Sequence, residues 1–155
     1  MKNIITSTAI LCIIACNNVQ TTATNSNSIS ISQQDESLAK TKHFKGAISN
    51  GMKGDSLSFD LSADGKKVSN LTFNGYWRCS GKLERQPVAG PDGSYDVVNG
   101  KVDGHISEPP NGGSTAWRFD LKASITGNKA SGTFRMNINN LGCDTYLLKF
   151  EATAK

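Results

Sequence analysis

The stretch from Trp117 to Ile138 constrains the fold more than any other part of the chain. Its first half alternates apolar residues with polar ones, as a half-buried β-strand does, at Trp117, Phe119, Leu121, Ala123 and Ile125. A turn at Gly127-Asn128 then returns the chain as a second strand. The sequence therefore predicts an antiparallel hairpin with one buried face.

The position of this turn also predicts the register of the hairpin. Each inward residue of one strand should face an inward residue of the other: Ile125 with Ala130, Ala123 with Gly132, Leu121 with Phe134, Phe119 with Met136 and Trp117 with Ile138. On the outer face the same register sets Asp120 opposite Arg135, which is a favourable cross-strand pair.

Two further hairpins and a closing strand are predicted from similar patterns. A hairpin around Asp64-Gly65 pairs Leu61 with Val68, and it needs a bulge near Ser69-Asn70 to turn Phe73 inward. Beyond Phe73 the strand either continues to Cys79 or turns widely near Asn74-Gly75, and the sequence leaves both open. Another hairpin surrounds Asn99-Gly100, with a three-residue loop that keeps Asp96 away from Asp103. A closing strand spans 141–153, with Tyr146, Leu148 and Phe150 in phase.

Two segments rich in Pro and Gly, Glu84 to Gly93 and Glu108 to Ser114, are predicted to be loops. Together with 15 glycines and frequent turn dipeptides, these patterns indicate an all-β domain. We expect an antiparallel β-sandwich of about eight strands, with a small closed β-barrel as the alternative.

The first residues have the layout of a secretory signal. Lys2 is followed by an apolar run that is too short for a stable membrane-spanning helix. The run ends in Ile13-Ile14-Ala15-Cys16, which resembles the lipobox of bacterial lipoproteins. The resemblance implies that residues 1–15 are removed and that Cys16 receives a diacylglyceryl group and an amino-terminal acyl chain, which together make a stable membrane anchor.

Residues 16–42 are predicted to be a lipidated and disordered polar tether, because Asn, Thr, Ser and Gln dominate and little apolar surface is available. Residues 43–155 form the β-domain. Asn17 stands where the best-studied lipoproteins carry Asp for retention at the inner membrane. The resemblance therefore implies the outer membrane, with the periplasmic face as first choice and the cell surface left open.

The lipoprotein resemblance also bears on the four cysteines. With Cys12 in the signal and Cys16 lipidated, Cys79 and Cys143 are the remaining thiols in an oxidising compartment, and we expect them to form a disulfide. A metal site on these two cysteines is the weaker alternative, because no histidine lies near them in the sequence.

The order of motifs in the domain has a looser resemblance. An FxL strand, a DGK turn, a mid-domain Cys, an ASGTF strand and a late Cys together resemble small secreted β-sandwich domains of bacterial envelope proteins whose role is undefined. This resemblance supports the fold and implies no particular activity.

Few residues in the sequence carry recognisable chemistry. His43 and His105 are the only histidines, and no serine has a nucleophile-elbow pattern around it. The acidic residues lie mostly in turns or on outward strand positions. The net charge of +4 is dispersed along the chain, which argues against nucleic acid as a partner. We therefore expect no enzymatic activity, no metal site and no cofactor.

The functional expectation is a membrane-tethered, non-enzymatic binding or assembly module. Its partner would be an envelope protein or a glycan, and the two loops rich in Pro and Gly are the expected contact region. Tyr76 and Trp77 are candidate binding residues, with Tyr76 the better candidate for an exposed ring because Trp117 is in phase with the core. The alternative is a periplasmic barrel that carries a small ligand or acts as an inhibitor.

Overall fold

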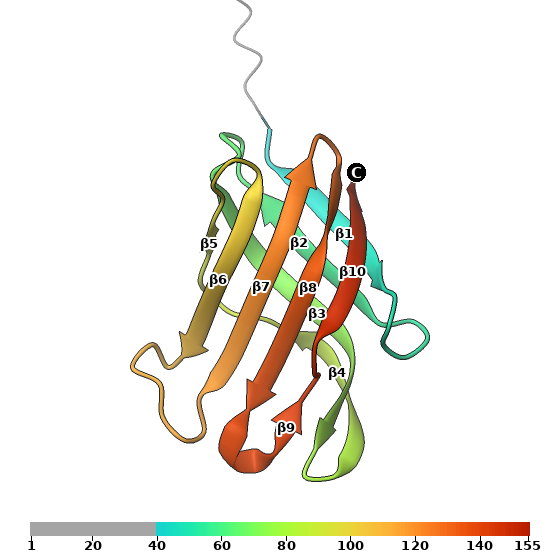
Figure 1. Cartoon of the computed structure of the whole chain (residues 1–155), viewed down its shortest axis with the longest axis vertical. Coiled ribbons are helices and arrows are strands. Elements are labelled where there is room, and N and C mark those ends of the chain that lie inside the picture. The colour runs from blue at the N-terminus through green and yellow to red at the C-terminus, as the bar shows by residue number, and fades with distance from the viewer. Residues whose placement is uncertain (1–39) are drawn as a thin grey trace, which may run out of the picture. The chain divides into compact units, whose positions relative to one another are not determined.

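The computed structural model describes residues 40–155, which form antiparallel β-structure and one short 3-10 turn. The predicted signal peptide, the predicted lipidation site at Cys16 and the predicted tether as far as residue 39 lie outside the described residues. The strands and the turn (Figure 1) are β1 (Lys42–Ile48), β2 (Ser56–Leu61), β3 (Lys67–Cys79), β4 (Lys82–Ala89), β5 (Tyr95–Asp96), β6 (Lys101–Glu108), β7 (Trp117–Thr126), β8 (Lys129–Ile138), η1 (Asn139–Leu141), β9 (Cys143–Asp144) and β10 (Leu148–Ala154).

The strands close into a ring. Hydrogen bonding follows the order β10-β1-β2-β3-β9-β8, and β8 pairs again with β10. The remaining strands lie outside this ring, where β7 and β6 extend the sheet from β8 while β4 and β5 pair with β3. In Figure 1, strands β6, β7, β8 and β10 form the near layer and β1, β2 and β3 lie behind them. The all-β prediction is confirmed, and the closed barrel is the architecture that the hydrogen bonds form.

All six phenylalanines of the chain lie in the interior of the barrel. Phe44 stacks on Phe59 at 5.1 Å between ring centroids, and Phe73 packs on Phe134 at 5.7 Å. Tyr95 completes the interior beside β7, where its hydroxyl donates a hydrogen bond of 3.2 Å to the carbonyl oxygen of Phe119. Burial of large aromatic side chains is the main favourable term that stabilises such a small domain.

The predicted hairpin from Trp117 to Ile138 is present as β7 and β8. Their ladder pairs Ile125 with Ala130, Ala123 with Gly132, Leu121 with Phe134 and Phe119 with Met136, as the alternation predicts. Gly127 opens the two-residue turn with a φ of 60°, a left-handed value that glycine adopts without strain. The ladder ends at Arg118 and Asn137, so the predicted pairing of Trp117 with Ile138 is not part of it.

Asp120 lies opposite Arg135 as predicted, but the two do not form the closest ion pair. Arg135 instead binds Asp144 of β9 through two hydrogen bonds, Nε to Oδ1 at 3.0 Å and Nη2 to Oδ2 at 2.5 Å. Because Arg135 is held by Asp144, the Asp120 carboxylate is available to accept a hydrogen bond from His105 of β6.

The second hairpin also follows the sequence. Leu61 pairs with Val68, and the register between β2 and β3 shifts between Ser58 and Asp60, so that Leu71 and Phe73 both turn inward. The bulge contains Asn70, whose φ of 51° lies in the left-handed region that asparagine tolerates. Of the two alternatives beyond Phe73, the continuous strand to Cys79 is the one that forms.

The predicted loop from Glu84 to Gly93 is wrong over most of its length, because residues up to Ala89 form β4. A two-residue turn at Ser80 and Gly81, both with positive φ, folds β4 back onto β3. The strand escaped prediction because its side chains are almost all exposed and show no alternation. Pro87 suits it, since an edge strand can include a residue without an N–H donor. The segment from Pro109 to Ala116 is irregular, as predicted.

The prediction of a three-residue loop at Asn99-Gly100 is also wrong. Val98 and Lys101 exchange two backbone hydrogen bonds of 2.9 Å, which closes a two-residue turn with positive φ at both central positions. The three-residue loop was expected because a shorter loop would place Asp96 against Asp103. These two carboxylates do not face each other, because β5 leaves β6 and pairs with β3. Asp96 instead forms an ion pair with Lys67, and Asp103 forms one with Lys122.

The closing strand begins later than predicted. β10 starts at Leu148, and Leu148 and Phe150 are buried in phase, whereas Tyr146 is 59% exposed. Tyr146 has a φ of 54°, and its N–H donates to the Asp144 carboxylate, so the chain turns here before it enters the strand.

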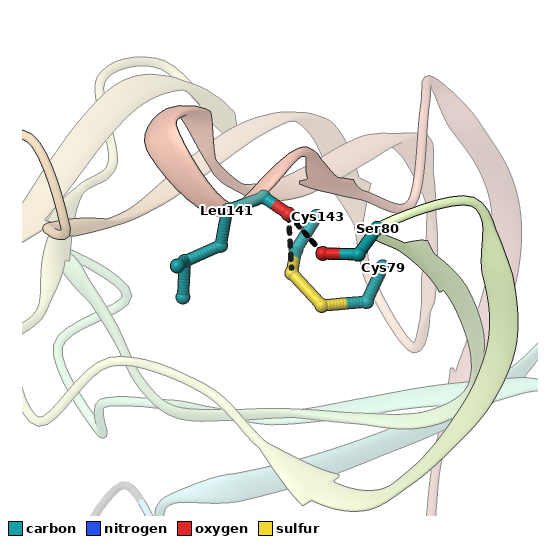
Figure 2. The surroundings of a disulfide bond; sticks show 4 residues. All are labelled: Cys79, Ser80, Leu141 and Cys143. Carbon is teal, nitrogen blue, oxygen red and sulfur yellow. Dashed lines mark hydrogen bonds between the residues drawn. A yellow bond between two sulfur atoms is a disulfide. The ribbon is translucent and has the colours of Figure 1, made fainter.

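The disulfide between Cys79 and Cys143 joins the end of β3 to β9 (Figure 2). The two residues face each other across the β3–β9 ladder, and Cys143 also pairs with Ile138 of β8. The Leu141 carbonyl oxygen accepts a hydrogen bond of 2.8 Å from Ser80 Oγ and lies 3.6 Å from Cys143 Sγ. The disulfide therefore fixes the short bridge that completes the ring.

Candidate functional site

An open groove lies where the end of β4 approaches the start of β7. Its volume is about 610 Å³, and its floor reaches the buried side chains of Leu71 and Phe119. The other residues that line it are Asn70, Thr72, Gln86, Val88, Ala89, Gly90, Pro91, Asp92, Glu108 and Trp117. Both predicted contact segments, 84–93 and 108–114, contribute to this groove, although the first of them is partly a strand.

Two local contacts hold the walls of the groove. Gly90 passes so close to β3 that a Cβ atom there would overlap the carbonyl oxygen of Leu71, so only glycine fits. The backbone N–H of Asp92 donates a hydrogen bond of 2.6 Å to Glu108 Oε1. This bond ties the segment after β4 to the end of β6, two regions that are distant in sequence.

The charge of the groove is one-sided. Asp92 and Glu108 are the charged residues among those that line it, and both are acidic. Val88 adds an apolar contact on the rim, since its side chain is 75% exposed. The groove therefore suits a ligand that combines a positive charge with some apolar surface.

A second hollow, of about 480 Å³, adjoins the groove along β6. Its lining includes Ile106, Ser107 and Pro110, and it shares Asp92 and Glu108 with the groove. A ligand that occupies the groove can extend past these two acidic residues along β6.

The candidate binding rings have different environments. Tyr76 is 37% exposed on β3, as expected for the better candidate for an exposed ring, whereas Trp77 is only 4% exposed and belongs to the core. Trp77 points inward because it keeps the phase of Phe73 along β3. It stacks on Trp117 at 5.2 Å, and Trp117 also stacks on Phe119 at 6.1 Å. These rings are packed together and do not form an open aromatic platform.

Both histidines lie on the surface, and each contacts an aspartate on the neighbouring strand. His43 Nδ1 is 2.7 Å from Asp60 Oδ1, and His105 Nδ1 is 2.7 Å from Asp120 Oδ1. Asp60 also accepts a hydrogen bond of 2.8 Å from Asn70 Nδ2. That bond is the main reason that the pKa of Asp60 is lowered, with the hydrogen bond and charge of His43 contributing further.

His105 has a second contact that the sequence analysis missed. Its Nε2 lies 2.9 Å from Ser107 Oγ, so Ser107, His105 and Asp120 form a continuous chain of side chains. The sequence pattern that indicates this contact is the i, i+2 spacing of His105 and Ser107, which places both side chains on one face of a strand. The aspartate could not be found in this way, because it comes from β7 across the β6–β7 ladder.

Within residues 40–155 the structure holds no group of three or more His, Cys, Asp or Glu side chains arranged to bind a metal ion. In the same part of the chain, no helix has the length and apolar character needed to cross a membrane. No protein-family model matches the chain, and neither a curated protein nor a solved structure does.

Proposed function

We propose that this protein is a lipid-anchored binding module of the bacterial envelope and that it takes an extended, basic segment of a partner protein into the acidic groove. The observation that carries the proposal is the pairing of Asp92 and Glu108 in an open groove with no basic lining residue. Electrostatic complementarity of this kind favours partners of the opposite charge and speeds their encounter.

The edge strand β4 supports an extended partner. β4 pairs with β3, and no second strand pairs with it within the described residues. Gln86 and Val88 of this strand line the groove. Unpaired strand edges offer backbone hydrogen bonds to an incoming peptide, while alternate side chains provide specificity.

The two competing ligand classes have less support. A small lipophile would need an apolar cavity, whereas the phenylalanines occupy the interior of this barrel. A glycan is usually held on an open aromatic face, and here Trp117 already stacks on Trp77 and Phe119.

The anchor is part of the same proposal. Cys16 would carry the diacylglyceryl group, and the polar tether would hold the barrel near the membrane with the groove free to bind. The intact mass of the membrane-extracted chain should show this adduct on Cys16, and an unmodified mature terminus at another residue would refute the anchor.

Photo-crosslinking in intact cells tests the groove. A photoreactive residue in place of Val88 should capture one partner, and the crosslink should map to a Lys- or Arg-bearing segment of that partner. Val98 provides the matched control, because it is 66% exposed but lies outside the groove. Asp92→Asn together with Glu108→Gln should lower capture about tenfold at low salt. Equal capture from Val88 and Val98, or a mapped segment without basic residues, would refute the proposal.

A further inference from the structure

We propose that Ser107, His105 and Asp120 form a nucleophilic site that cleaves carboxylic esters by acyl transfer. This activity goes beyond the binding function and does not depend on it, because its three side chains lie on the outer face of β6 and β7 and none of them lines the groove. The expectation of no enzymatic activity was based on the sequence, in which these residues are not recognisable as a group.

The hydrogen bonds define the direction of proton transfer. The Asp120 carboxylate can only accept, so the proton on His105 must be on Nδ1, which donates to Oδ1 at 2.7 Å. In the neutral imidazole Nε2 then has a free lone pair and accepts from the Ser107 hydroxyl at 2.9 Å. This is the arrangement in which a histidine acts as general base toward a serine and an aspartate orients the imidazole.

The neighbouring arginines supply positive charge. Arg118 is directly opposite Ser107 in the β6–β7 ladder, and its Nη2 donates to the Gly113 carbonyl oxygen at 3.3 Å. Its Nη1 is buried, and within the described residues it has no hydrogen-bond partner. A cationic side chain across the ladder from the nucleophile favours the negative oxygen that develops when the serine attacks an ester. Arg135, on the far side of Asp120, is held by Asp144 and adds to the positive field around that carboxylate.

The site is accessible to a substrate. The side chains of His105 and Asp120 are 50% and 44% exposed, and both line an open hollow of about 480 Å³ on the outer face of β6 and β7. An ester whose acyl or alcohol part rests in this hollow lies beside His105 and can bring its carbonyl carbon to Ser107 Oγ. The outer face is open to water, which the second half of the reaction needs.

The reaction requires only the ester and water. Ser107 Oγ attacks the carbonyl carbon while its proton moves to His105 Nε2, and the positive charge of Arg118 on the neighbouring strand favours the negative tetrahedral oxygen. The bond from carbon to the alcohol oxygen then breaks, and the alkoxide takes the proton from Nε2, which leaves an acyl group on Ser107. Water adds to this acyl group by the same sequence of proton transfers and releases the carboxylic acid.

The first experiment is labelling of the full-length chain with a fluorophosphonate, a reagent that bonds to activated serines with loss of fluoride. We expect one adduct per chain, mapped by peptide mass spectrometry to Ser107. Ser107→Ala should abolish it, and His105→Gln should slow it about 100-fold, in line with the usual contribution of a general base. The same two changes should remove the acyl-enzyme burst with p-nitrophenyl acetate.

His43→Gln is the matched control, because His43 makes the same contact with an aspartate but no contact with a serine. It should leave labelling of Ser107 unchanged, and this also separates the site from the slow esterase action of any exposed imidazole. Added imidazole should restore part of the labelling in His105→Ala, whereas a variant that has lost its fold would show no rescue.

Asp120 is a positioning residue, and its test compares two variants. Asp120→Asn should slow labelling about tenfold by releasing the imidazole, and Asp120→Glu should recover part of the loss. Adducts spread equally over several serines, or labelling of Ser107 that His105→Gln leaves unchanged, would overturn the proposal. These outcomes do not bear on crosslinking at Val88, so the two proposals can fail separately.

Discussion

The two histidine-aspartate pairs of this protein have the same geometry and different surroundings. His43 and Asp60 face each other across β1 and β2, and His105 and Asp120 do so across β6 and β7, each with 2.7 Å between Nδ1 and Oδ1. The difference begins two residues along the strand. Lys45 follows His43 on the same face, whereas Ser107 follows His105.

The comparison shows that a paired imidazole becomes a candidate base only through the environment of its second nitrogen. At His105 that nitrogen contacts Ser107, and the ladder adds Arg118 opposite the serine. At His43 the corresponding ladder partner of Lys45 is the neutral Ser58. The first pair stabilises a strand junction, while the second has the components of a nucleophilic site.

Removing the disulfide should have the largest effect on the protein. Of the two histidine-aspartate pairs, only His105 and Asp120 lie near this disulfide. Cys79→Ser opens a loop closed over a sequence separation of 64 residues, so the free energy of unfolding should fall by up to about 4 kcal/mol. β9 carries Asp144, the partner of Arg135, and loosening β9 should therefore disturb His105 more than His43.

Chemical denaturation measures the loss of stability, and the ring signals of both histidines in NMR spectra measure its location. The same experiment under reducing conditions is the control, because the wild-type protein should then behave like the variant. Equal shifts at both histidines would contradict the regional difference.

A serine introduced next to the His43–Asp60 pair should have an intermediate effect. Lys45→Ser places a hydroxyl two residues after His43 on the same strand face. We expect a second fluorophosphonate adduct at position 45, formed about tenfold more slowly than the one at Ser107 because no arginine lies opposite. Lys45→Ala is the control, and an adduct rate equal to that of Ser107 would show that Arg118 contributes nothing.

The smallest expected effect concerns acid stability at the first pair. Hydrogen bonds from Asn70 and His43 lower the pKa of Asp60 in the folded chain below its unfolded value. The stabilisation is therefore present above the unfolded value of about 3.9 and is lost as the pH falls through the folded value. Asn70→Ala should raise the pKa of Asp60 and flatten this acid dependence, as measured by thermal unfolding from neutral pH downward. If the acid dependence of stability is the same in Asn70→Ala, it must come from carboxylates other than Asp60.

Local patterns accounted for the strands that bury one face. The alternation before Gly127 predicted the β7–β8 register, and the phase change near Asn70 predicted the bulge in β3. Both succeed because a tight turn and a period of two link sequence position directly to side-chain direction. The disulfide was also predicted, because the lipoprotein resemblance assigns Cys12 and Cys16 to the signal and the anchor and so leaves Cys79 and Cys143 to pair.

The failures are elements whose partners are distant in sequence or whose side chains are exposed. β4 has no buried face to generate a pattern, and its existence depends on the free edge of β3. β5 pairs with β3 and not with β6, which no local rule indicates. The face of Trp77 could not be predicted, because the sequence left open whether the strand continued past Gly75.

The sequence by itself determined the all-β class, the hairpin of β7 and β8, and the shared strand face of His105 and Ser107. These features depend only on neighbours within one strand or one turn. Only the tertiary structure decided that Asp120 and Arg118 lie opposite this histidine and serine. β6 and β7 are joined by the irregular segment from Pro109 to Ala116, whose length and turns leave the register unspecified. That register is fixed instead by packing in the shared core, as is the meeting of Asp92 with Glu108. Both candidate sites consist of such long-range contacts.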